Sequence, residues 1–128
     1  MLKSYPAIFS KEDEGYSVIF PEFKGGTQGD DLEESMRMAQ EFLAGIIAYY
    51  IDEDIELPKP SDINKLKSDN GFVTLIQADP KPYIRGNKTV RKNVTVPEWL
   101  VKKAEQSQIN FSETLTEALY KKLEEDRA

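Results

Sequence analysis

The sequence of 128 residues contains no cysteine and no histidine. Without cysteine the chain has no disulfide, no thiolate metal ligand and no thiol nucleophile, which suits a reducing cytoplasm. Without histidine it lacks the commonest general base near neutral pH and the commonest metal ligand. Hydrolysis by a serine–histidine pair is therefore excluded.

The sequence also lacks a long apolar run and a signal peptide. The longest apolar run, Phe42–Ile51, is far too short to span a bilayer, and charges begin at Lys3. Apolar residues make up 39% and charged residues 31%, as in globular proteins with a modest core. We therefore expect a cytoplasmic protein without a membrane partner.

Motifs for catalysis are missing as well. Gly25-Gly26 is not followed by the lysine or further glycines of a phosphate-binding loop. The strand-like runs Tyr16–Phe20 and Phe72–Gln77 carry no acidic residue that could hold paired metal ions about 4 Å apart. The carboxylates that come nearest to such a set are Glu22, Asp30, Asp31 and Glu34. We predict no catalytic residue, no cofactor and no metal, and hence no enzyme.

Charge is unevenly distributed along the chain. Residues 1–84 hold eight Lys/Arg and sixteen Asp/Glu, a net charge of −8, whereas residues 85–128 hold nine and seven, a net charge of +2. In the second part, Glu98 is the one acidic residue among a basic group: Arg85, Lys88, Arg91, Lys92, Lys102 and Lys103. The basic part suits a phosphate-rich partner, and the acidic part suits a different one.

The first part has the pattern of a small α+β domain. Strand-like runs at Leu2–Ser10 and Gly15–Pro21 flank an acidic turn, and a short third strand is expected around Thr27–Gln28. A helix is expected from about Asp31 to Ile51, and a further strand at Phe72–Ala78. This order predicts a small antiparallel sheet with one long helix across a face.

The expected helix has a capping residue and an apolar stripe. Asp30 or Asp31 is suited to cap its first turn. The stripe comprises Leu32, Met36, Ala39, Leu43, Ile46 and Tyr50, at spacings of three and four residues. We expect this stripe to pack on the strands and form the core.

The second part has the pattern strand, proline, helix, turn and helix. Val94 and Val96 point to one side of an extended segment, whereas Arg91, Asn93 and Thr95 point to the other. A lone strand leaves its backbone groups unpaired, and nothing after it reads as a partner. The simplest remedy is a second copy of the chain, paired antiparallel through residues 89–96. Its polar face then suits the major groove of DNA.

This segment resembles the ribbon-helix-helix DNA-binding domain. The resemblance implies that the polar side chains of the strand face the groove and that backbone amides near Asn110–Glu113 hold a phosphate. Lys92 departs from the pattern, since the family usually has an inward apolar residue there. The expected DNA-binding residues are Lys88, Arg91, Lys92, Asn93, Thr95, Asn110 and Ser112. The alternative is a dimerisation strand with no role in DNA binding.

The chain as a whole, from Tyr5 to Leu123, resembles the HicB antitoxin family. The resemblance rests on FPEF, TQGD-LEES and LPKPS at these spacings, followed by the ribbon-helix-helix segment. It implies a partial ribonuclease H-like domain at residues 1–80, a linker at 81–87 and a DNA-binding, dimerising domain at 88–128. It further implies an antitoxin that blocks an mRNA-cleaving HicA toxin, and a repressor that acts on operator DNA as a homodimer.

Acidic residues are the candidates for toxin binding, because an RNA-cleaving toxin needs a basic face. They are Glu12, Asp13, Glu14, Asp30, Asp31, Glu33 and Glu34. A solvated charged rim is the alternative for any one of them. A second hypothesis for the whole chain is a stand-alone repressor whose first domain senses a small ligand. Its site would be lined by Tyr5, Tyr16, Phe20, Phe23, Tyr49 and Tyr50.

Overall fold

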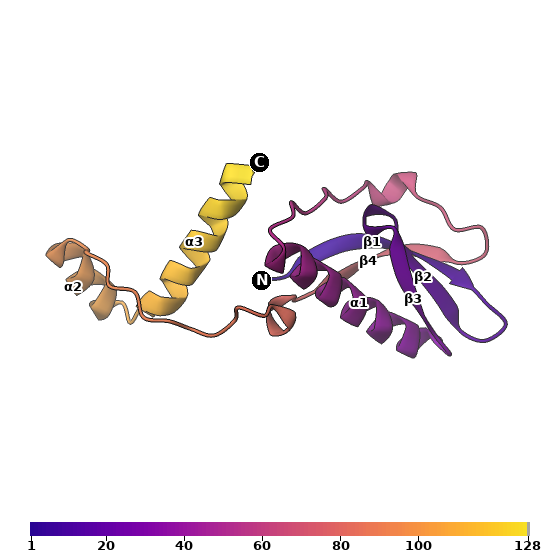
Figure 1. Cartoon of the computed structure of the whole chain (residues 1–128), viewed down its shortest axis with the longest axis horizontal. Helices are drawn as coiled ribbons and strands as arrows, with labels where there is room; N and C mark the ends of the chain where they lie inside the picture. Colours follow the sequence, from indigo (N-terminus) through magenta and orange to yellow (C-terminus); the bar gives the residue numbers. More distant parts are fainter. Residues whose placement is uncertain (128) are drawn as a thin grey trace. The chain divides into compact units, whose positions relative to one another are not determined.

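The computed structural model describes residues 1–127, and the chain divides into two compact units. The first unit comprises residues 1–88, and the second begins at Thr89 (Figure 1). No helix in the described residues combines the length and the apolar character that crossing a bilayer requires.

The first unit is built on a four-stranded antiparallel sheet. Its strands are β1 (Lys3–Lys11), β2 (Tyr16–Phe20), β3 (Gly25–Gly29) and β4 (Phe72–Ala78), in the spatial order β3-β2-β1-β4. All three adjacent pairs of strands run antiparallel. The strands expected from the sequence, including the short third one, are therefore confirmed.

Helix α1 (Leu32–Asp52) follows β3 and packs across one face of the sheet (Figure 1). Its start is held by two reciprocal hydrogen bonds. The backbone N–H of Glu34 donates to Asp31 Oδ1 at 2.7 Å, and the backbone N–H of Asp30 donates to Glu34 Oε1 at 3.0 Å. These bonds satisfy free donors at the helix start. Asp31 is the capping residue, as one of the two expected alternatives.

The apolar stripe expected on α1 is only partly correct. Leu32 and Met36 are exposed. The reason is a close approach between α1 and β3: a Cβ added to Gly29 would lie 2.4 Å from the backbone nitrogen of Ser35. Small side chains therefore face the strand where the helix begins. The buried positions of α1 are Ser35, Ala39, Leu43, Ala44, Ile47 and Ala48.

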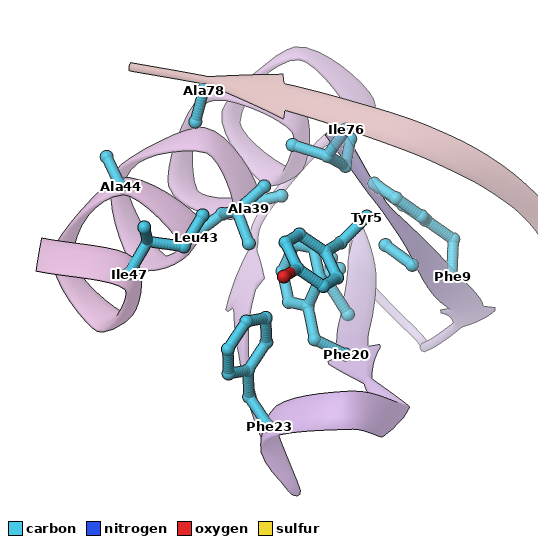
Figure 2. Close-up of a cluster of buried hydrophobic side chains, with 12 residues drawn as sticks. Tyr5, Phe9, Phe20, Phe23, Ala39, Leu43, Ala44, Ile47, Ile76 and Ala78 are labelled. Carbon is cyan, nitrogen blue, oxygen red and sulfur yellow. The ribbon is translucent and has the colours of Figure 1, made fainter. Parts of the chain in front are cut away.

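The core lies between α1 and the sheet. Figure 2 shows Leu43 and Ile47 of α1 in the same cluster as Phe20 and Tyr5 of the strands. Aromatic rings dominate the cluster on the side of the strands. The ring of Phe23 lies 4.8 Å from that of Tyr5 and 5.3 Å from that of Tyr50, edge to face in both cases. Edge-to-face pairs add to the free energy gained by burial.

Tyr5 also joins the core to the segment that follows α1. Its hydroxyl donates to the backbone oxygen of Pro58 at 2.6 Å. Burial, with smaller contributions from Glu22 and Tyr50, raises the pKa of the Tyr5 phenol to about 12. The folded chain therefore holds this proton more tightly than the unfolded chain, in which a tyrosine titrates near pH 10.

Replacing Tyr5 with phenylalanine is expected to lower the free energy of unfolding by about 1 kcal/mol near neutral pH, because Pro58 loses its donor. The contribution of the Tyr5 proton to stability is complete below about pH 10 and is lost as the pH rises toward about 12. The difference between wild type and Tyr5→Phe should shrink over that interval. Urea unfolding of both proteins across the pH range measures it; parallel curves would contradict the assignment.

The segment between α1 and β4 is fastened to the sheet by hydrogen bonds. The backbone N–H of Ser61 donates to Glu22 Oε1 at 2.6 Å, beside the short helix η1 (Pro21–Phe23). The Ser68 hydroxyl donates to the backbone oxygen of Phe9 at 2.7 Å. Between these points lies the helical turn η2 (Ile63–Lys65), which contacts β4.

The linker expected at residues 81–87 is largely attached to the first unit. Residues Lys81–Tyr83 form the helical turn η3, which contacts α1. Arg85 then pairs with two carboxylates at the end of α1: its Nε lies 3.3 Å from Asp52 Oδ2, and its Nη2 lies 2.9 Å from Glu53 Oε1. The unit accordingly ends after Lys88 rather than at residue 80.

The second unit contains α2 (Glu98–Gln106) and α3 (Phe111–Arg127). Gln108, with a φ of 57°, lies in the turn between them, and the Asn110 side chain caps α3 by accepting from the backbone N–H of Glu113 at 3.0 Å. The two expected helices and their turn are thus present. The strand expected within residues 89–96 is not formed by a single chain; these residues are extended, exposed and outside any sheet.

Candidate functional site

The second unit lacks a buried core. Among its described side chains, none of the large apolar ones is buried. On α3 they recur every four residues, at Phe111, Leu115, Leu119 and Leu123, so they form one exposed stripe. The full set of exposed apolar residues is Val90, Val94, Val96, Trp99, Leu100, Ile109, Phe111, Leu115, Leu119 and Leu123. An exposed apolar surface of this extent indicates a protein interface.

The residues expected to bind DNA fall into two groups, and all except Lys88 belong to the second unit. Lys88, Arg91, Lys92, Asn93 and Thr95 lie in the extended segment, and all five are exposed. Asn110 and Ser112 lie instead at the start of α3, where Asn110 Oδ1 is used by the helix cap. The residues of the first group are therefore neighbours along the chain.

The basic character of the chain is confined to a shorter stretch than the sequence indicates. Divided after Lys88, the first unit holds ten Lys/Arg and sixteen Asp/Glu, a net charge of −6, and the second unit holds seven of each. Arg85 is already paired with Asp52 and Glu53, whose hydrogen bonds raise the pKa of its guanidinium. Lys88, Arg91 and Lys92 are exposed and make no ion pair within the part of the chain that the structure describes.

The candidate toxin-binding carboxylates come from two segments that the fold brings together. Gly15, which ends the β1–β2 turn, lies directly against the backbone at the start of α1: a Cβ added to it would lie 1.9 Å from Gly29 O and 2.5 Å from Asp30 C. Its φ of 70° also favours glycine. All seven carboxylates therefore lie at one end of the unit, which we call the acidic end (Glu12, Asp13, Glu14, Asp30, Asp31, Glu33 and Glu34).

The carboxylates of the acidic end differ in the hydrogen bonds and ion pairs that they make. Asp31 and Glu34 accept hydrogen bonds from the start of α1, and Arg37 Nη2 lies 4.0 Å from Glu34 Oε2. Across the described residues, the side chains of Glu12, Asp13 and Glu14 make no hydrogen bond or ion pair, and all three are exposed. The turn between β1 and β2 thus presents three free carboxylates.

The sequence-based interpretation missed the tie between Arg85 and α1. Arg85 follows its partners Asp52 and Glu53 by more than thirty residues. No local pattern relates them, since each residue also reads as an ordinary surface charge. These ion pairs attach the end of the expected linker, residues 85–87, to the first unit.

Comparison with known proteins identifies the chain's relatives. The family model described as "HicB_like antitoxin of bacterial toxin-antitoxin system" matches residues 5–121. An uncharacterized 14.9 kDa protein of Haemophilus phage HP1 is 32% identical over 107 residues, which are 80% of this chain and 79% of the phage protein.

Solved structures agree with this match. A chain of a toxin–antitoxin complex from Streptococcus pneumoniae is 33% identical, with a TM-score of 0.62, over 95% of this chain and 99% of that one. A chain of a HicA3 and HicB3 toxin–antitoxin complex is 26% identical, with a TM-score of 0.51, over 61% of this chain and all of that one (100%). Together with the small antiparallel sheet, the long helix and the two further helices, these matches show that the chain belongs to the HicB-like antitoxin family of bacterial toxin–antitoxin systems.

Proposed function

We propose that this chain neutralises a HicA-type mRNA-cleaving toxin with its first unit and represses its own operon with a dimer of its second unit. The observation that carries the proposal is the contrast between the units. The first unit has a complete core and an acidic end, whereas none of the large apolar side chains described in the second unit is buried. A unit without its own core requires a partner to fold stably.

A second copy of the chain is the partner that suits the second unit. Two extended segments paired antiparallel would satisfy the backbone groups that a single chain leaves free at residues 89–96. The exposed Val94 and Val96 would then be covered by the helices of both copies. The opposite side of the paired strands would present Arg91, Asn93 and Thr95 twice, as a two-stranded ribbon suited to the major groove.

The first unit suits a basic partner. Its net charge is −6, and the free carboxylates of the β1–β2 turn lie at its acidic end. A protein that binds and cleaves mRNA needs a positively charged face for its substrate. An acidic antitoxin surface can steer association with that face and compete with RNA for it.

The proposal is tested by purifying the chain together with the toxin encoded beside it, and by assaying mRNA cleavage with and without the chain. We expect a stable complex and suppression of cleavage at equimolar antitoxin. Cleavage that continues unchanged at an excess of antitoxin would contradict the first half of the proposal.

Replacing Arg91 or Asn93 with alanine is expected to weaken operator binding by about 1–3 kcal/mol, because each side chain is proposed to contact a base edge. The matched control is Arg37→Ala, which removes a positive charge from the first unit, where Arg37 pairs with Glu34 and Glu41. Fluorescence anisotropy with labelled operator DNA at fixed salt gives the dissociation constants. Unchanged binding by both ribbon variants would mean that the strand serves dimerisation alone.

The ligand-sensing repressor is less well supported. The aromatic residues expected to line a ligand site are used in the core: Tyr5, Phe20 and Phe23 are buried, and Tyr16 and Tyr50 pack against the same cluster. Tyr49 is the exposed member of the set. A metabolic gene rather than a small basic toxin gene beside this one would favour the sensor.

A further inference from the structure

The face of the sheet that points away from α1 carries no charged side chain in any of the four strands. Residues on this face follow from the strand register, because side chains alternate and the core residues Tyr5, Phe9, Val18 and Ile76 define the inner face. The outer positions are Ser4, Pro6, Ile8, Ser10, Ser17, Ile19, Gly26, Gln28, Val73, Leu75 and Gln77. For a chain with 31% charged residues, such a face is unusual.

The centre of this face is apolar. Ile8 on β1 pairs with Ile19 on one side and with Val73 on the other, and Leu75 follows two positions along β4. Directly paired side chains lie about 5 Å apart and diagonal ones about 7–8 Å apart, so the four are neighbours on this face. We call Ile8, Ile19, Val73 and Leu75 the outer-face patch. Ile19 is 49% exposed and Leu75 is 52% exposed, whereas Ile8 and Val73 are half-buried and the adjacent Pro6 is buried.

The outer-face patch continues into the free carboxylates of the acidic end. Beyond Ile8 and Ile19, the next outer pair is Ser10 with Ser17, and the β1–β2 turn with Glu12, Asp13 and Glu14 follows at once. Lys11, at the end of β1, lies on the inner face, where its Nζ is 5.1 Å from the centre of the Tyr16 ring. An apolar centre thus borders the three exposed carboxylates of the β1–β2 turn.

We propose that the outer-face patch and the β1–β2 turn form the surface on which the toxin docks. Apolar side chains of the toxin would cover Ile19 and Leu75, and its basic side chains would pair with Glu12, Asp13 and Glu14. This inference rests on the proposed function and adds to it the place where the toxin binds. It also explains why polar but uncharged residues surround the patch, since buried unpaired charges would oppose docking.

The negative charge beside the outer-face patch favours a basic protein as its partner over a second copy of the chain or nucleic acid. A second copy would bring another unit of net charge −6 against the same carboxylates, and the exposed apolar set of the second unit already provides for self-association. Nucleic acid would be repelled by the same carboxylates.

The test uses the full-length chain and a catalytically inactive variant of the toxin encoded beside it, which can be purified. Leu75→Lys places a cation within the patch, at an exposed position of the edge strand β4, where lysine is well tolerated. We expect the dissociation constant for the toxin to rise at least about 30-fold, as for a central interface residue. Reversing the charges of Glu12, Asp13 and Glu14 together should lower the association rate constant about tenfold or more at low salt.

The matched control is Tyr49→Lys. Tyr49 is 52% exposed, as Leu75 is, but it lies on α1, which covers the opposite face of the sheet. We expect its affinity for the toxin to stay within about twofold of wild type, and circular dichroism melts should show that both variants fold. Equal affinities for Leu75→Lys and wild type, or a loss confined to Tyr49→Lys, would overturn the proposed surface while the antitoxin function stands. A change in the oligomeric state of Leu75→Lys would assign the face to self-association and overturn it too. If wild type itself fails to bind the toxin, the proposed function is the part that fails.

Discussion

Replacing Leu119 with aspartate is expected to leave the chain monomeric at micromolar concentration and to abolish operator binding. Leu119 lies in the middle of the exposed α3 stripe and is 56% exposed in the single chain. In a dimer the substitution would bury an unpaired carboxylate and remove a leucine from the shared core, each at a cost of several kcal/mol. Sedimentation and DNA-binding measurements on the same preparation report both effects.

The control for this substitution is Lys121→Gln, which changes the net charge by the same amount. Lys121 is on α3 but two residues beyond Leu119, and so faces away from the stripe. It should remain dimeric and bind operator DNA nearly as wild type does. Toxin binding should survive in Leu119→Asp, because the first unit has its own core. A dimeric Leu119→Asp protein would contradict the proposed role of the stripe.

Cutting the chain after Lys88 is expected to separate the two activities completely. Residues 1–88 should inhibit the toxin with nearly full affinity and lose all measurable operator binding, while residues 89–128 should bind operator DNA without inhibiting the toxin. The physical reason is that the buried core lies within the first unit, whereas the exposed apolar side chains of the second unit can pair with a second copy. Calorimetric titration with the toxin and anisotropy with operator DNA measure the two fragments.

A shorter fragment, residues 1–82, is compared with the fragment of residues 1–88. It lacks Arg85, so Asp52, whose side chain is only 12% exposed, loses its ion pair and the backbone donor of Arg85. We expect residues 1–82 to melt at a lower temperature than residues 1–88 while still binding the toxin. Identical melting temperatures would mean that the tie between Arg85 and α1 adds nothing to the stability of the unit. Operator binding by residues 1–88 would contradict the division of function.

Much of the fold could be predicted from local patterns. The β1–β2 hairpin, the strand at Phe72–Ala78 and the helices each have their own periodicity and end signals, and all are present in the structure. The expected stripe on α1 failed at Leu32 and Met36, because the side of the helix that is buried depends on the neighbouring strand. Gly29 lets the backbones of β3 and α1 approach closely, and helical spacing alone cannot indicate that.

The candidate site was predictable only in its parts. The two groups of acidic residues could be read from the sequence as separate charged segments, and the extended polar segment at residues 88–95 could be read as a ribbon. The pairing of that ribbon remains a prediction, because its hydrogen-bonding partner would belong to a second molecule. The outer-face patch was not found, since Ile8, Ile19, Val73 and Leu75 become neighbours only through strand pairing.

The sequence by itself determined the kinds of chemistry this chain lacks, the identity and order of its elements, and the contrast between an acidic first part and a more basic second part. These properties depend on composition and on neighbours within a few residues. Only the tertiary structure decided that Gly15 meets Asp30, so that the acidic segments share one end, and that Arg85 pairs with Asp52 and Glu53. Such contacts join residues distant in the chain, and many folds compatible with the same local patterns would place them apart.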